Sequence, residues 1–364
     1  MAQKQLRGIE KLVKGIFIYL NPYQIHNTAG MIYSLIHASS PLVSQIARGF
    51  PYTKNYKPAR KRIERFLRNR QCLFTPCHIQ YLKWIIGFLP DQKRTSIIID
   101  YTFLGRYMIL WAAVPFKNRA IPIHFKVIAN PLITHVKQKD RMIHLEIDFL
   151  RFLRIHLPQN RRWVIVADRG FGNQRNIGLC EKIGFDYVLR FKGDIRITAR
   201  GSAHHLKNRK IKHLPQAKWR RGVLFKGLTV NLLSLTEGTD DPWYLITNLK
   251  NPNTVQKLYE QRFWIEEMFR DLKTHQEMKK TLIRSLNVTK RLCFLLQLSY
   301  SVVFFIGVLA KKSILVQKRI LGSSKASFVF IALQVLSQLP KKFHVFLKKV
   351  IRNLRLNRAV LDTS

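Results

Sequence analysis

The fold is decided by three consecutive runs, TSIIIDYTFL (95–104), RYMILWAAVPF (106–116) and AIPIHFKVIAN (120–130). Each run is rich in aliphatic, β-branched and aromatic residues, and only short turns at Gly105 and at residues 117–119 separate them. Runs of this length and composition, joined by turns this short, predict a meander of three adjacent antiparallel strands.

Helices and strands alternate after this meander. Apolar residues recur at helical spacing in MIHLEIDFLRFLRIHL (142–157) and in NQRNIGLCEKIG (173–184), which ends at a glycine. Continuous apolar runs in RRWVIVAD (161–168) and FDYVLRFK (185–192) indicate buried strands. The predicted order is βββαβαβ, so we expect an α/β fold with a mixed sheet and a ribonuclease H-like core.

The flanking segments have other patterns, which divide the chain into regions 1–90, 91–290 and 291–364. The first is helical and basic, and its residues 41–69 fit either a helix-turn-helix or an ordinary exposed basic helix. Short β-like runs from about 192 to 242 indicate a β-rich insertion into the middle region, followed by a strand, WYLITNL, and a helix over 254–273. The last region is helical.

The charge of the chain is far from balanced. Lysine and arginine number 64 against 20 aspartate and glutamate residues, which gives a net charge of +44 over 364 residues. Such an excess destabilises a compact fold by self-repulsion unless a polyanion neutralises it, and the usual polyanion is nucleic acid. We therefore expect the chain to bind nucleic acid, with region 1–90 as a helical DNA-binding domain.

Two features suggest other classes of protein, and each has a simpler explanation. The stretch Leu292 to Ala310 is uncharged and long enough to span a bilayer, but polar residues interrupt it and a helix buried in a large domain explains it better. Cys72, Cys77 and His78 lack a second ligand pair at zinc-like spacing, so we expect buried thiols and no zinc. The N-terminus lacks the pattern of an export signal. We expect a cytoplasmic, nucleoid-associated protein with no membrane partner.

Two scarce carboxylates follow apolar runs. Asp100 follows three isoleucines, and Asp168 follows WVIVA, which places both at strand ends, where the sites of α/β proteins form. Carboxylates that converge on divalent ions can support phosphodiester cleavage. An aspartate that merely begins a turn gives the same local pattern, so for either residue alone both readings stay open.

The helix over 254–273 supplies a third carboxylate. At about 100° per residue, one arc of roughly 60° gathers Tyr259, Arg262, Glu266 and Lys273. We expect the opposite face of the helix to pack on a core. The face with Tyr259, Arg262, Glu266 and Lys273 is then either part of a site or a solvent-exposed face on which Arg262 and Glu266 form an ordinary ion pair. Glu267 and Asp271 lie about 100° and 140° from Glu266, and we expect both to be surface acids.

The spacing of Tyr259, Arg262, Glu266 and Lys273 resembles the YREK signature of bacterial DDE transposases of the insertion-sequence-four family. The contexts IIIDYTFL around Asp100 and VADRGFGN (166–173) are similar to the first and second aspartate motifs of that family. A β-rich insertion before the glutamate is also the arrangement of the family.

The resemblance implies that Asp100, Asp168 and Glu266 bind two catalytic Mg²⁺ ions, for which Mn²⁺ can substitute. It makes region 91–290 the catalytic domain.

The resemblance also implies DNA contacts. Tyr259, Arg262 and Lys273 would hold phosphates near the element end. Trp243 would stack on a flipped base, although a core tryptophan explains it equally well. Arg169 is a weaker candidate for a DNA contact.

The expected function is that of an insertion-sequence transposase. It would bind the terminal inverted repeats as double-stranded DNA, cleave at the element ends with metal-activated water, and join the 3′-hydroxyl to target DNA. Holding two ends together implies a homodimer. The alternatives are a ribonuclease H-like nuclease, an inactive DNA-binding derivative and a membrane protein anchored by Leu292 to Ala310.

Overall fold

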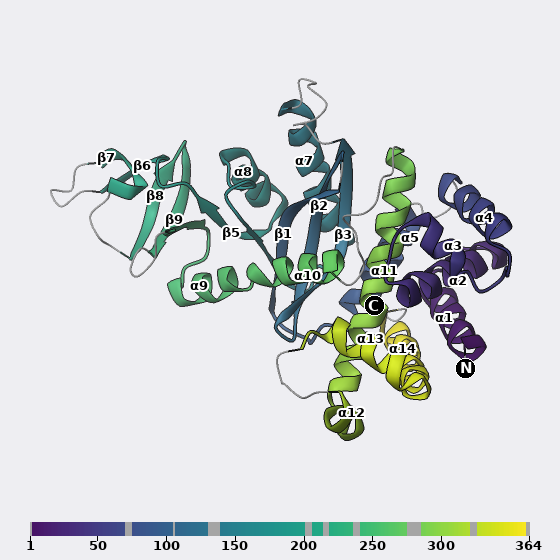
Figure 1. Ribbon diagram of the computed structural model, residues 1–364. Coiled ribbons are helices and arrows are strands. Elements are labelled where there is room, and N and C mark those ends of the chain that lie inside the picture. The colour runs from purple at the N-terminus through teal and green to yellow at the C-terminus, as the bar shows by residue number, and fades with distance from the viewer. Residues whose placement is uncertain are drawn as a thin grey trace.

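The computed structural model describes residues 2–69, 75–104, 106–129, 139–200, 206–213, 218–235, 241–274, 285–320 and 326–361. At its centre lies a ten-stranded sheet in the order β3-β2-β1-β4-β5-β10-β9-β8-β6-β7. Helices gather at the β3 side of the sheet, and the other end extends away from them (Figure 1).

The predicted meander is confirmed as β1 (Arg94–Leu104), β2 (Tyr107–Phe116) and β3 (Arg119–Ala129), paired antiparallel. Strand β2 lies between the other two, and its first eight residues are all buried. Lys117 and Asn118 connect β2 to β3 with φ angles of 50° and 60°. Two successive positive φ values give a hairpin turn whose twist matches that of the strands.

The predicted alternation that follows is also confirmed. It consists of α7 (Lys139–His156), β4 (Arg162–Ala167), α8 (Gln174–Ile183) and β5 (Asp186–Phe191). Strand β4 runs parallel to both β1 and β5, so the sheet is mixed. Gly184 ends α8 in the left-handed conformation, with φ 78°, which a glycine adopts without strain.

The segment predicted as a β-rich insertion forms four strands and continues the same sheet. These strands are β6 (Arg196–Arg200), β7 (Leu206–Lys210), β8 (Trp219–Phe225) and β9 (Leu228–Leu235). Strand β10 (Trp243–Thr247) joins them to the core because it pairs antiparallel with β9 on one side and with β5 on the other.

The single helix predicted over 254–273 is wrong, because two helices occupy this segment, α9 (Pro252–Glu260) and α10 (Phe263–Thr274). At the break, the Arg262 amide bonds to the Tyr259 carbonyl and the Ile265 amide bonds to the Arg262 carbonyl. Bonds to the third preceding residue tighten the chain relative to an α-helix. The Ser96 hydroxyl also donates to Gln261 Oε1 at 2.5 Å, which fixes the break against β1.

The remaining helices come from both ends of the chain. They are α1 (Ala2–Ile16), α2 (Pro22–Ala38), α3 (Val43–Arg48), α4 (Tyr56–Arg68), α5 (Thr75–Ile86), α11 (Leu286–Lys311), α12 (Ile314–Arg319), α13 (Phe328–Gln338) and α14 (Pro340–Leu361). Helix α11 runs between β3 and the N-terminal helices, and α14 packs against α1 (Figure 1).

Helix α11 contains the stretch long and apolar enough to cross a membrane. Within the protein, 94% of its most apolar window is buried. Among its neighbours, the Tyr81 hydroxyl lies 2.7 Å from that of Ser301, and Arg291 donates to the Leu67 carbonyl at 2.9 Å. These contacts give Ser301 and Arg291 partners inside the fold, as expected for the central helix of a large core.

Candidate active site

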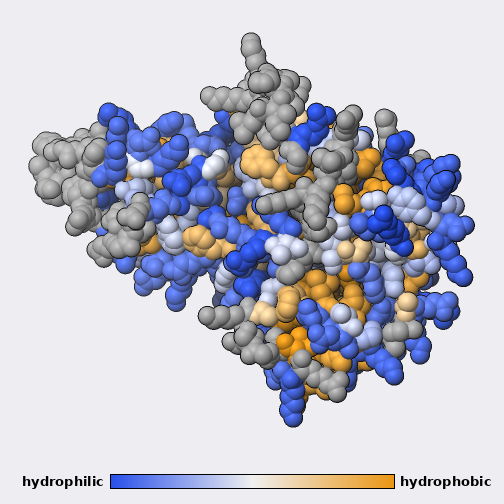
Figure 2. Space-filling model, viewed as in Figure 1, coloured by the Kyte–Doolittle hydropathy of each residue, from blue (hydrophilic) through white to orange (hydrophobic). Residues whose placement is uncertain are grey.

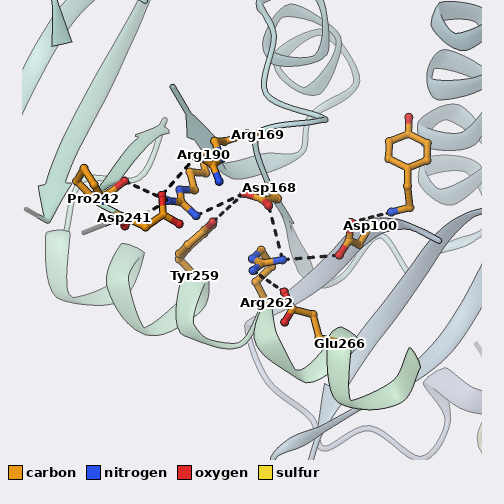
Figure 3. A network of polar contacts seen from close by, with 10 residues as sticks. Asp100, Asp168, Arg169, Arg190, Asp241, Pro242, Tyr259, Arg262 and Glu266 are labelled. Carbon is orange, nitrogen blue, oxygen red and sulfur yellow. Dashed lines mark hydrogen bonds and ion pairs between the residues drawn. The ribbon is translucent and has the colours of Figure 1, made fainter. Parts of the chain in front are cut away.

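Two of the predicted carboxylates lie side by side on neighbouring parallel strands. The pairing of β1 with β4 ends at Ile99 opposite Ala167, so Asp100 and Asp168 are the next residue on each strand. The expectation that both end a strand is wrong for Asp100, because β1 continues to Leu104 through its pairing with β2. Asp100 instead marks the point where the parallel pairing stops, and its side chain turns toward Asp168 (Figure 3).

The third carboxylate reaches the same place from the first turn of α10. All three carboxylates surround the guanidinium of Arg262, a residue only 4% exposed. Its Nη1 lies 3.7 Å from Asp100 Oδ2 and 4.0 Å from Asp168 Oδ2, and its Nη2 donates to Glu266 Oε1 at 2.7 Å (Figure 3). The helix break is what turns Arg262 inward, into the space between the two strands and α10.

The neighbouring acid Glu267 faces elsewhere. Its carboxylate contacts Arg119 and Arg270, away from the Arg262 guanidinium. The sequence-based choice of Glu266 over Glu267 therefore agrees with the geometry. The expectation that Asp271 is a surface acid is wrong, because it is only 6% exposed.

The electrostatics of the cluster follow from its burial. Burial raises the pKa of Asp100 to about 6. The negative charges of Asp168 and Glu266 act in the same direction, while the Tyr101 amide and Arg262 lower this pKa. At neutral pH the site therefore concentrates negative charge that a cation must balance. Arg262 supplies one such cation.

Carboxylates are the oxygen ligands that Mg²⁺ and Mn²⁺ prefer, so the chemistry of the three side chains fits such ions. Among the residues that the structure describes, however, no three acidic, histidine or cysteine side chains are placed to hold one metal ion. The reason is visible in Figure 3, where the Arg262 guanidinium takes the point between the carboxylates. Arg262 must leave that point before all three could share an ion.

Tyr259 and Trp243 form the wall of the site next to Asp168. Tyr259, at the end of α9, is fully buried and donates its hydroxyl to Asp168 Oδ1 at 3.3 Å. Burial and the charge of Asp168 raise the pKa of this phenol, so it stays protonated as a donor. The Trp243 ring lies 4.9 Å from the Tyr259 ring and 5.7 Å from that of Phe263, which is 38% exposed.

The last two predicted residues lie at the margins. Lys273 belongs to the last turn of α10, and its ammonium lies 5.8 Å from the centre of the Phe269 ring. Seven residues of helix place it about 10 Å along the axis from Glu266. Arg169 follows Asp168 directly, and its Nη1 lies 3.4 Å from Asp241 Oδ1.

Arg190 and Asp241 were not among the residues predicted from the sequence. Arg190 lies in β5 with a side chain only 4% exposed, and its Nη1 is 3.8 Å from Asp168 Oδ1. Its Nη2 contacts the carboxylate of Asp241. The signal was present in the run YVLRF (187–191), where Arg190 stands among aromatic and aliphatic residues. A charge in such a strand is buried only with a partner.

The cysteines near His78, which we expected to be buried thiols, lie in another part of the chain. Cys77 is fully buried in α5, and Cys72 lies outside the described residues.

Comparison with known proteins adds one finding. Residues 136–302 match the model of a family described as a transposase DDE domain. The match supports a DDE transposase, an enzyme of a DNA-cutting family. The matched segment contains Asp168, Tyr259, Arg262, Glu266 and Lys273, and it begins after Asp100. No curated protein matches the chain.

Proposed function

We propose that this chain is the transposase of a bacterial insertion sequence of the insertion-sequence-four type. It binds the terminal inverted repeats, cleaves DNA at the element ends, and joins the freed 3′-hydroxyl to target DNA. The observation that carries the proposal is the convergence of Asp100, Asp168 and Glu266 on one point. The strand order β3-β2-β1-β4-β5 supports a ribonuclease H-like core.

In this proposal Asp100, Asp168 and Glu266 hold two Mg²⁺ ions, or Mn²⁺ in their place. When bound, such ions activate a water or a 3′-hydroxyl for attack and stabilise the leaving oxygen. Tyr259 orients Asp168 through its hydroxyl, and burial keeps that hydroxyl protonated. Arg262, once it leaves the carboxylates, presents a planar fork beside the site that suits a DNA phosphate.

DNA binding is supported by the distribution of charge. Helix α4 buries Ile63, Phe66 and Leu67 and exposes the basic residues Lys57, Arg60, Lys61, Arg65 and Arg68. Hydrophilic side chains cover most of the face in Figure 2, and apolar surface gathers over α13 and α14. The proposal also includes a helix-turn-helix formed by α3 and α4. It further includes a homodimer that holds the two ends of the DNA element together.

The test uses DNA that carries the terminal inverted repeats flanking the gene, incubated with the protein and Mg²⁺. We expect 3′-hydroxyl nicks at the repeat ends and joined products. Glu266→Gln should abolish both, while the matched change Glu267→Gln should leave both within a few fold, because Glu267 faces Arg119 and Arg270.

The proposal fails if the wild type is no more active than Asp168→Ala. Nicks without joined products would indicate a nuclease, and binding without nicks would indicate an inactive derivative of a transposase.

A further inference from the structure

An aspartate at the edge of the site lies against two arginines. Asp241 lies two residues before the start of β10, and its side chain is 58% exposed. Its Oδ1 contacts Nη2 of Arg190 and lies 3.4 Å from Nη1 of Arg169 (Figure 3). An exposed carboxylate therefore takes the anion position of an arginine pair that flanks Asp168.

Arg190 is held rigidly from the other sides. Its Nη2 donates to the carbonyls of Asp241 and Pro242 at 3.3 and 3.2 Å, and its Nη1 lies 3.8 Å from Asp168 Oδ1. The side chain is only 4% exposed. A buried guanidinium in this setting needs an anion, and the exposed carboxylate of Asp241 supplies one.

The chemistry of this position suits a phosphate. Arginine forks bind carboxylate and phosphate oxygens with the same geometry, so one can replace the other. Positive charge prevails here. Hydrogen bonding to Arg190 lowers the pKa of Asp241 most, and the charges of Arg190, Arg169 and Arg262 lower it further.

We propose that Arg169 and Arg190 form a phosphate-binding position beside Asp168, and that Asp241 occupies it in competition with a DNA phosphate. The inference rests on the proposed function, because it takes the DNA backbone to pass the second aspartate. Asp241 is then neither a metal ligand nor a mere surface acid. It lowers the affinity for DNA by holding the two arginines until a phosphate displaces it.

The test compares Asp241→Asn with Asp91→Asn. Both changes remove one negative charge that lies beside arginine. Asp241 contacts Arg169 and Arg190, whereas Asp91 is fully exposed and lies 3.6 Å from Arg161 Nη2. Asp91 precedes the start of β1, whereas the parallel pairing of β1 with β4 ends at Ile99, beside the site. Asp91 therefore lies away from Asp168 along this strand. The readout is the anisotropy of a fluorescent DNA duplex of random sequence over a range of salt concentrations.

We expect Asp241→Asn to bind the duplex about fivefold more tightly than Asp91→Asn, since an exposed ion pair is worth up to about that factor. The slope of log affinity against log salt should steepen by about 0.9, the value for one further phosphate contact. Both gains should disappear when Arg169→Ala is added to Asp241→Asn.

Equal affinities and slopes for the two aspartate variants would overturn the inference. So would a change in cleavage by Asp241→Asn with DNA binding unaltered, because Asp241 would then only position Arg190. Failure of the wild type to bind DNA in a salt-dependent way would instead refute the proposed function itself.

Discussion

Removing the Arg262 guanidinium should destabilise the protein and, at the same time, improve its response to Mg²⁺. Arg262→Ala leaves Asp100, Asp168 and Glu266 around an empty point with no cation between them. The Coulomb attraction between the guanidinium and one carboxylate about 4 Å away is roughly 4 kcal/mol at an effective dielectric constant near 20, before the cost of desolvation is subtracted. Loss of one partner from a buried pair costs about 3–5 kcal/mol.

The cost here should lie at the lower end of that range. The three carboxylates are 24%, 32% and 51% exposed, so water screens the repulsion left behind. We therefore expect Arg262→Ala to lower the free energy of unfolding by about 2–4 kcal/mol without metal. Mg²⁺ should recover part of this loss, by about 2.7 kcal/mol at a hundred times its dissociation constant.

The assay is urea unfolding of DNA-free protein in EDTA and in Mg²⁺. Stabilisation by Mg²⁺ should be larger in Arg262→Ala than in the wild type, where the ion must first displace the guanidinium. Arg270→Ala is the control, because Arg270 is 67% exposed and pairs with Glu267 one residue away from the site. Its loss should change stability by no more than about 0.5 kcal/mol. The reasoning is refuted if Arg262→Ala matches the wild type in EDTA, or if Mg²⁺ stabilises both equally.

Two further predictions concern the core. In Gly307→Ala the new Cβ would lie 1.9 Å from the Phe328 carbonyl oxygen, so α11 and α13 must separate, and urea unfolding should show a loss of about 1–3 kcal/mol in the free energy of unfolding. Gly178→Ala meets open space and should raise the free energy of unfolding by about 0.5–1 kcal/mol. Equal effects of the two changes would contradict the packing of α11 against α13. Burial holds the pKa of His124 well below 6.5, and the groups that add to this are His78, Lys126 and His156. The unfolded chain therefore takes up a proton that the folded chain does not, and the free energy of unfolding should fall by up to about 1.4 kcal/mol per pH unit below 6.5. His124→Phe should flatten this dependence between about pH 7 and 5, and an unchanged slope would show that His124 is protonated in the folded state.

The strands could be predicted because their signals are local. Apolar runs joined by short turns mark β1 to β3, and apolar runs between helices mark β4 and β5. The parallel pairing of β1 with β4 then brings Asp100 next to Asp168. The side of α10 that carries Glu266 could be predicted from helical periodicity, since this helix is regular from Phe263 onward. The match of residues 136–302 to a transposase DDE domain supports the coarse assignment made from these motifs.

The features that could not be predicted depend on distant contacts. The periodicity of 254–273 continues through Gln261, and only the bond from Ser96 and the inward turn of Arg262 reveal the break. A helical wheel with one apolar side places Asp271 on the exposed face. In the structure α10 contacts both β1 and β3, so a wider part of its surface is buried. The pairing of Arg190 with Asp241 joins residues 51 positions apart.

The sharing of β10 between the core and the inserted strands has a geometrical consequence for the enzyme we propose. Strand β10 is hydrogen-bonded to β5 on one side and β9 on the other, so the inserted strands continue the core sheet. A tethered module can slide to different distances from a cutting point. An arm that is continuous with the sheet cannot, so in the proposed enzyme any DNA that these strands contact would lie at a constant distance from the carboxylates around Arg262.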